Sequence, residues 1–253
     1  MRFKELKRSI FTVAACLMVS IVTAEEITVA VASNFTASMK SIVRQFERDT
    51  RHKVKLVFGS SGKFYAQIKN GAPFQAFLSA DQDKPIALEK EKLILENSRF
   101  TYATGRLALW SSTLNVADLR ALILSQGHYN KLALANSKLA PYGRATEEIL
   151  SNLLLIGQTK GKWVKGENIS QTYQFVSTGN ADLGFVALSQ IMTDKQITRG
   201  SAWIVPEHLH QPIKQDAVIL LAGKGSPATI ELMQFMISEE AKLIMESHGY
   251  YVL

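Results

Sequence analysis

Residues 26–92 repeat one pattern three times: a short apolar strand, a polar turn and a segment with helical periodicity. The strands are expected at residues 26–32, 54–58 and 76–78. Strands that alternate with helices normally pair in parallel, with the helices packed on both faces. The first strand is close to continuously apolar, as is typical of parallel strands buried on both faces. The pattern predicts a doubly wound α/β sheet.

The turn after the second strand, residues 58–64, concentrates hydrogen-bond donors. Gly59, Ser60, Ser61 and Gly62 stand between the strand and a helix expected to end near residue 70. Free N–H groups, two hydroxyls and the positive end of a helix dipole favour an anion at such a turn. The alternative is that Ser60 or Ser61 only caps the helix. Ser33 and Asn34, after the first strand, form a second candidate N-cap.

From about residue 104 the strand and helix pattern restarts. Strands are expected at 106–110, 131–135, 182–186 and 217–222, and helices at 116–125, at 144–155 and from residue 169 or 170. Two α/β lobes follow from this restart. Ligands of open α/β sheets bind beyond the carboxyl ends of the strands, so the cleft between the lobes is the expected site.

Residues 1–24 are predicted to be a signal peptide. Four basic residues precede an apolar run of about 13 residues, which is too short to span a bilayer, and small residues end at Ala24. The alternative is lipoprotein processing at Cys16. Either route exports the chain, and we expect a periplasmic protein.

Processing after Ala24 changes the composition of the mature chain. Glu5 and the four basic residues leave with the leader, so the net charge falls from +7 to +4 and gives no reason to expect a nucleic-acid partner. Cys16 is the one cysteine and leaves too. The mature chain therefore cannot use disulfides, thiolate nucleophiles or cysteine-bound metals.

Several motifs together resemble the periplasmic molybdate-binding proteins of ABC transporters. They are ITVAVASNFT at 27–36, FGSS at 58–61, GAP at 71–73, FLSADQ at 77–82, PYG at 141–143, ENI at 167–169 and DLGFV at 182–186. The resemblance covers essentially the whole mature chain. It implies a type II periplasmic-binding-protein fold with two doubly wound lobes and two crossovers. The first lobe would comprise residues 25–103 and 223–253, and the second lobe residues 104–222.

The resemblance also implies a site. The family holds a tetrahedral oxyanion with neutral donors from both lobes. The positions in this chain that carry those donors are Ser33, Asn34, Ser60, Ser61, Tyr142 and the backbone N–H of Ile169. Molybdenum would be held only as bound molybdate, with no other cofactor. The expected partner is an ABC permease in the inner membrane, and the receptor is expected to be a monomer without enzymatic activity.

The chain departs from the family pattern in the position of one tyrosine. Many members carry a tyrosine where this chain has Ala187, and a small residue where it has Tyr142. We interpret Tyr142 as a phenol that enters the cleft from the opposite wall.

Other ligands and one other function class remain open from the sequence. Neutral donors suit a fully deprotonated dianion, which favours molybdate, tungstate or sulfate over partly protonated phosphate. The receptor could be tuned to tungstate or to another oxyanion. The alternative of a different class is an exported hydrolase that uses Ser60 or Ser61, although no general base accompanies these serines in the sequence.

Overall fold

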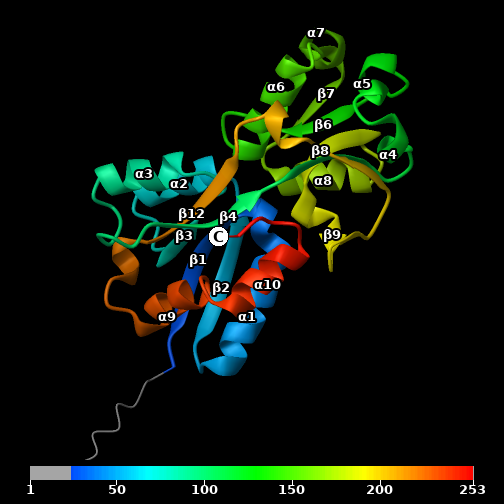
Figure 1. The fold of residues 1–253 in the computed structure, drawn as a ribbon. Coiled ribbons are helices and arrows are strands. Elements are labelled where there is room, and N and C mark those ends of the chain that lie inside the picture. The colour runs from blue at the N-terminus through cyan, green and yellow to red at the C-terminus, as the bar shows by residue number, and fades with distance from the viewer. Residues whose placement is uncertain (1–23, 253) are drawn as a thin grey trace, which may run out of the picture.

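The structure is a computed structural model that describes residues 24–252 (Figure 1). Nearly all of the predicted signal peptide therefore lies outside the described residues. Two lobes, each with its own five-stranded sheet, make up the fold. This confirms the predicted type II arrangement of two α/β lobes. Within residues 24–252, none of the helices has the length and apolarity needed to cross a membrane.

The sheet of the first lobe combines parallel and antiparallel strands. Its order is β2 (Lys53–Gly59), β1 (Glu26–Ala32), β3 (Ala76–Leu78), β12 (Ile213–Ile219) and β4 (Phe100–Gly105). β1 pairs in parallel with β2 and β3, whereas β12 runs antiparallel to β3 and β4. The helices of this lobe are α1 (Thr36–Asp49), α2 (Ser61–Lys69), α3 (Asp83–Lys90), α9 (Pro227–Phe235) and α10 (Glu239–Ser247).

Both faces of this sheet are covered by helices. Val29 of β1 lies in one core with Met39 of α1, and α9 and α10 complete that layer. The next residue, Ala30, packs with Phe64 of α2 in a second core that includes α3. Successive side chains of a strand point to opposite faces, so the continuous apolar run of β1 serves both layers.

The second lobe repeats the plan with a different strand order. Its sheet runs β11 (Ser201–Ile204), β5 (Leu107–Ser111), β8 (Leu183–Ala187), β6 (Leu132–Ala135) and β7 (Trp163–Gly166). β6 pairs in parallel with β7 and β8, and β5 is antiparallel to β8 and β11. The helices are α4 (Val116–Leu119), α5 (Leu122–Gln126), α6 (Pro141–Asn152), α7 (Ile156–Thr159) and α8 (Ile169–Ser177), and β9 (Met192–Thr193) and β10 (Gln196–Ile197) form a small hairpin.

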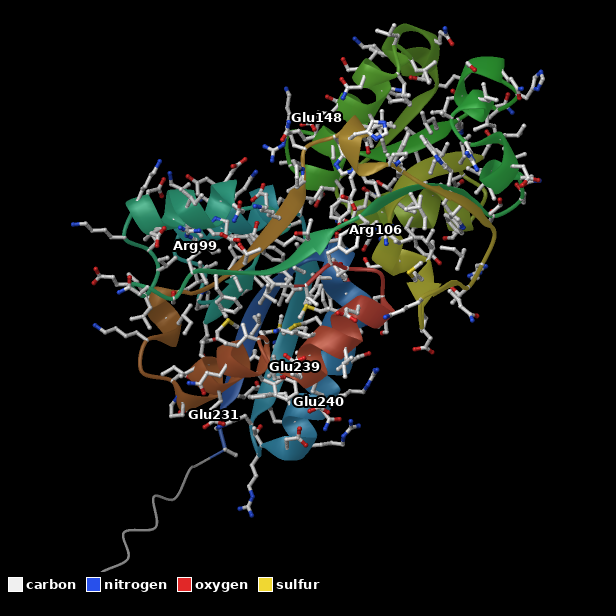
Figure 2. All side chains as sticks on the ribbon, in the orientation of Figure 1. Arg99, Arg106, Glu148, Glu231, Glu239 and Glu240 are labelled. Atoms are coloured by element: carbon white, nitrogen blue, oxygen red, sulfur yellow. The ribbon has the colours of Figure 1, made fainter. Side chains whose placement is uncertain are left out.

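The chain crosses between the lobes twice. One crossover runs through Arg106, between β4 and β5, and the other through residues 205–212. After α10 the C-terminal segment returns to the first crossover, where the backbones of Tyr251 and Thr104 exchange hydrogen bonds of 2.7 and 3.0 Å. The Arg106 guanidinium lies 4.7 Å from the centre of the Tyr251 ring, at the junction of the lobes (Figure 2).

The second crossover comes earlier than predicted. Residues 104–222 were assigned to the second lobe, but β12 pairs with β3 and β4 of the first. The boundary predicted at residue 222 is therefore wrong, and the return to the first lobe precedes Ile213. An apolar strand has the same local pattern whichever sheet it joins, because only long-range pairing decides its neighbours.

Two local predictions are also corrected. The single helix expected at 116–125 is divided into α4 and α5, because Arg120 between them has a left-handed φ of 51°. Neither Ser33 nor Asn34 caps α1 with its side chain; the two residues form a 3-10 turn with Phe35, and α1 begins at Thr36.

Candidate functional site

One small cavity lies between the lobes, at the carboxyl ends of β1 and β2. Its empty space is about 190 Å³, which includes the open space at its mouth. The structure brings all six predicted site residues to its wall: Ser33, Asn34, Ser60, Ser61, Tyr142 and Ile169. They come from four segments, each at the N-terminal end of a helix or helical turn. Such ends present free N–H groups and a partial positive charge.

The two serines of the first lobe differ in what their side chains do. Ser60 Oγ accepts a hydrogen bond from Lys63 N at 3.4 Å, so Ser60 is the N-cap of α2. Ser61 Oγ accepts from the backbone N–H of Ala80 at 2.9 Å and is 1% exposed. A hydroxyl that already accepts keeps its own hydrogen for donation. Both serines keep a hydroxyl hydrogen, but Ser60 is held in the role of helix cap, so Ser61 is the one that we expect to donate to the cavity.

Asn34 joins the site to the junction of the lobes. Its Nδ2 donates to Gln215 Oε1 at 2.9 Å and to Tyr250 Oη at 3.0 Å, and lies 3.5 Å from Tyr142 Oη. An amide nitrogen has two hydrogens, and the two shorter bonds account for both. The donor that Asn34 has left to offer the cavity is its backbone N–H.

Tyr142 reaches the same network from the second lobe. Its side chain is 1% exposed, and Oη accepts from Gln215 Nε2 at 3.0 Å. Burial and the neighbouring Tyr250 hydroxyl raise the pKa of Tyr142 well above 10. The phenol is therefore neutral at physiological pH, and its single hydrogen can be donated either to the Tyr250 hydroxyl beside it or to a ligand.

Gly105 makes room for this phenol on the first crossover. A Cβ built on Gly105 would overlap Tyr142 Oη and Gln215 Nε2. The sequence analysis did not single out Gly105, Gln215 or Tyr250. In the sequence Gln215 stands between Lys214 and Asp216, ahead of the apolar run that begins at Ala217, so it carried no local signal of burial.

The fourth segment begins α8. Asn168 is the N-cap, and its Oδ1 accepts from the backbone N–H groups of Ser170 at 3.0 Å and Gln171 at 3.1 Å. Ile169 is the first residue of the helix, where no carbonyl of the same helix can accept its N–H. Ser33 Oγ donates to the same Asn168 Oδ1 at 3.3 Å, which links the two lobes beside the cavity.

Ala187 lies away from this set of donors. It ends β8 with no exposed surface, and its backbone N–H donates to Gln190 Oε1 at 2.9 Å. Among the residues described, Ala187 does not line the cavity, whereas Tyr142 does.

The lining of the cavity is uncharged. Of the described residues, those that form its wall include no Asp, Glu, Lys, Arg or His. No group of three or more His, Cys, Asp and Glu within residues 24–252 is arranged to hold a metal ion. A wall of neutral donors can bind a deprotonated oxyanion without a cationic side chain.

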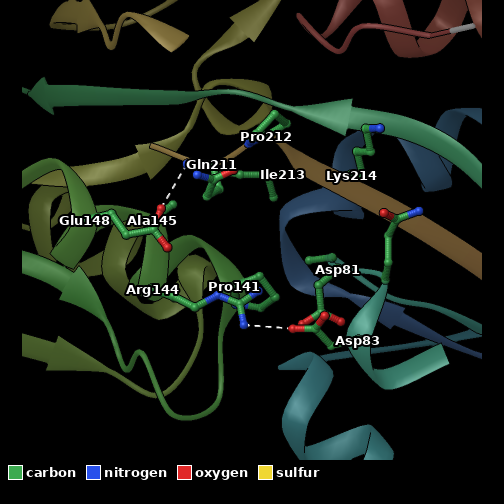
Figure 3. A pocket seen from close by; sticks show the side chains of 12 residues that line it. Asp81, Asp83, Pro141, Arg144, Ala145, Glu148, Gln211, Pro212, Ile213 and Lys214 are labelled. Carbon is green, nitrogen blue, oxygen red and sulfur yellow. Dashed lines mark hydrogen bonds and ion pairs between the residues drawn. The ribbon is translucent and has the colours of Figure 1, made fainter. Parts of the chain in front are cut away.

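A larger pocket adjoins the cavity between the lobes (Figure 3). It shares Ala80 and Pro141 with the cavity and is lined by charged residues, among them Asp81, Asp83 and Arg144. The charged groups therefore surround the cavity at some distance and leave its wall neutral.

Comparisons with known proteins agree with this geometry. The family model described as bacterial extracellular solute-binding protein matches residues 27–251. A molybdate-binding protein of Azotobacter vinelandii is 48% identical, over 97% of both chains, and one of Rhodobacter capsulatus is 42% identical, over 90% of this chain and 88% of that one. The solved structure of a periplasmic molybdate-binding protein of A. vinelandii superposes with a TM-score of 0.86 at 35% identity, over 90% of this chain and 99% of that chain.

The family match spans both lobes and both crossovers, so it accounts for the whole fold described here. Its members are named for binding solutes, which confirms the prediction that the chain is not an enzyme. The hydrolase alternative also lacks a local basis, because none of the described residues that line the cavity is a His, Asp or Glu that could act as a general base for Ser60 or Ser61. The protein belongs to the family of bacterial extracellular solute-binding proteins.

Proposed function

We propose that this protein is a periplasmic receptor for molybdate that delivers its ligand to an ABC-type permease for import. The observation that carries the proposal is the convergence of four helical N-termini and neutral donors on one cavity of about 190 Å³. The chain's 48% identity to a molybdate-binding protein supports the choice of ligand.

The proposed ligand set uses donors from both lobes. The hydroxyls of Ser61 and Tyr142 and the backbone N–H groups of Asn34 and Ile169 would surround the oxyanion. Ser33 would join this set by turning its hydroxyl hydrogen, which goes to Asn168 Oδ1 in this structure, toward the ligand. Ser60 would act indirectly, since it caps α2 and orients the turn. Donors of this kind mainly donate to the lone pairs of the ligand, so a protonated oxyanion forms fewer of these hydrogen bonds than a deprotonated one.

Tungstate has the same charge and shape as molybdate, and we propose that it binds as well. Sulfate is smaller and would leave part of the ligand shell unfilled. Phosphate carries a proton at neutral pH and would bind weakly for want of an acceptor. We further propose export by cleavage after Ala24, a monomeric receptor, and no cofactor besides the ligand.

Calorimetry of the mature chain against molybdate, tungstate, sulfate and phosphate tests the proposal. Thermal unfolding provides a second readout, because a ligand that binds only the folded state raises the free energy of unfolding by about 2.7 kcal/mol at a hundredfold excess over Kd. We expect molybdate to raise the unfolding midpoint and phosphate to leave it unchanged. An unchanged midpoint at millimolar molybdate would overturn the proposed function.

A further inference from the structure

The first turn of α2 is one of the places where the first lobe touches the second. Gly62 N–H donates to the carbonyl of Leu139 across the cleft at 3.0 Å. A Cβ on Gly62 would lie 3.0 Å from that oxygen and 3.1 Å from Leu139 Cα, which is tighter than ordinary packing. The two backbones are thus in direct contact immediately beside Ser61.

An ion pair lies next to this backbone contact. Lys63 Nζ, in the first lobe, is 2.6 Å from Glu167 Oε2 in the second. Lys63 follows Ser61 by two residues, and Glu167 precedes Ile169 by two residues. The pair therefore joins two of the segments that form the cavity wall, without lining the cavity itself.

A second ion pair spans the cleft at the adjoining pocket. Arg144 Nη1, in the first turns of α6, is 2.8 Å from Asp83 Oδ2 at the start of α3 (Figure 3). Arg144 follows Tyr142 by two residues, so this pair also joins segments that carry the cavity.

Exposed ion pairs stabilise a rigid fold very little, because water screens them and long side chains lose entropy. The Lys63–Glu167 and Arg144–Asp83 pairs differ from ion pairs within one rigid unit, because the two partners of each pair belong to different lobes. They exist only while the lobes are closed, so their whole contribution goes to the closed state. The apparent Kd of a ligand varies inversely with the fraction of protein in the binding-competent state.

We propose that the interlobe ion pairs, Lys63–Glu167 and Arg144–Asp83, set how tightly and how long the ligand is held, although neither pair touches it. This inference rests on the proposed function of oxyanion binding. The four residues act as positioning residues that hold the two halves of the cavity wall together.

Charge exchange within one pair tests the proposal. The variants are Lys63→Glu, Glu167→Lys and the double exchange, measured for molybdate Kd and dissociation rate at low and high ionic strength. The matched control is the exchange Lys69→Glu with Glu91→Lys. Lys69 lies on α2, as Lys63 does, and its Nζ is 2.9 Å from Glu91 Oε1, but both partners of this pair belong to the first lobe. Arg144→Glu with Asp83→Arg repeats the cycle for the second pair.

We expect each single reversal at the Lys63–Glu167 pair to weaken binding about three- to tenfold through faster dissociation, since repulsion replaces attraction. The double exchange should return Kd to within about twofold of the parent, and high ionic strength should remove most of the difference. The proposal is overturned if Lys63→Glu behaves like Lys69→Glu, or if the double exchange restores nothing. A parent chain that binds no molybdate at all would instead refute the proposed function.

Discussion

At the scale of single residues, the site depends on hydroxyls that each already accept a hydrogen bond from the protein. Ser61 Oγ accepts from Ala80 N–H, and Tyr142 Oη accepts from Gln215 Nε2. Each hydroxyl is left with a single hydrogen, and that hydrogen can only be donated. The wall is therefore suited to an anion without protons of its own.

Ser61→Ala removes one such donor. We expect binding of molybdate to weaken by about 1.5–3 kcal/mol, the usual value of a hydrogen bond to a charged partner. Calorimetry measures the loss. Ser60→Ala is the control, because it removes a helix cap and should lower the free energy of unfolding by about 1 kcal/mol with little effect on Kd. Equal affinities of the Ser61→Ala variant and the parent would reduce Ser61 to a structural residue.

Tyr142→Phe removes only the phenolic oxygen from the opposite wall. The expected loss is again about 1.5–3 kcal/mol, or one to two decades in Kd. Ala187→Tyr provides the comparison, since it places a phenol at the position where the family resemblance implies one. If Tyr142→Phe is neutral and Ala187→Tyr tightens binding, Tyr142 is not the substitute for the missing tyrosine.

At the scale of elements, the start of α8 joins helix stability to ligand binding. Asn168 Oδ1 accepts from two backbone N–H groups of the helix and from Ser33 Oγ of the other lobe. The cap thus fixes the direction of the Ile169 N–H and contributes to the contact between the lobes.

Asn168→Ala should lower the free energy of unfolding by about 1 kcal/mol and also weaken molybdate binding. Ser238→Ala is the matched control, because Ser238 caps α10 by accepting from Ala241 N at 3.2 Å and does not line the cavity. Chemical denaturation and calorimetry on both variants separate the two effects. Affinities that are equally unchanged in the two variants would show that the α8 cap serves the fold alone.

At the scale of the whole molecule, buried phenols gather where the lobes, the crossovers and the C-terminal segment meet. Tyr102 Oη donates to Gln215 Oε1 at 2.9 Å, and Tyr250 Oη donates to the carbonyl of Asn34 at 2.9 Å. Burial raises the pKa of Tyr102 and Tyr142 well above 10, and raises that of Tyr250 as well. Each phenol therefore holds its proton more firmly in the folded chain than in the unfolded chain.

This difference predicts a loss of stability in alkali. A raised pKa contributes stability that is complete below the unfolded value, about pH 10, and declines as the pH rises above it. Denaturation midpoints measured from about pH 8 to 11 should fall steeply at the upper end. Tyr102→Phe should make that fall shallower, and an unchanged slope would show that Tyr102 does not contribute to it.

Local patterns in the sequence were sufficient to predict most of the strands and helices of this fold. The bounds of β1 and β3 agree with the ranges expected from the apolar runs in the sequence. The segments that carry the site residues could also be identified from the sequence, because each lies where a helix or helical turn begins. Such helix starts depend on neighbours within a few residues, and those neighbours are visible in the sequence.

Long-range pairing decided the rest. The membership of β12 in the first sheet, and with it the position of Gln215, depends on strands more than a hundred residues away. The surroundings of Asn34 depend on Tyr250, at the other end of the chain. The sequence by itself therefore determined which segments carry donors. Only the tertiary structure decided which of those donors face the cavity and which form hydrogen bonds between the lobes. The physical reason is that hydrogen bonds between distant segments leave no local pattern in the sequence.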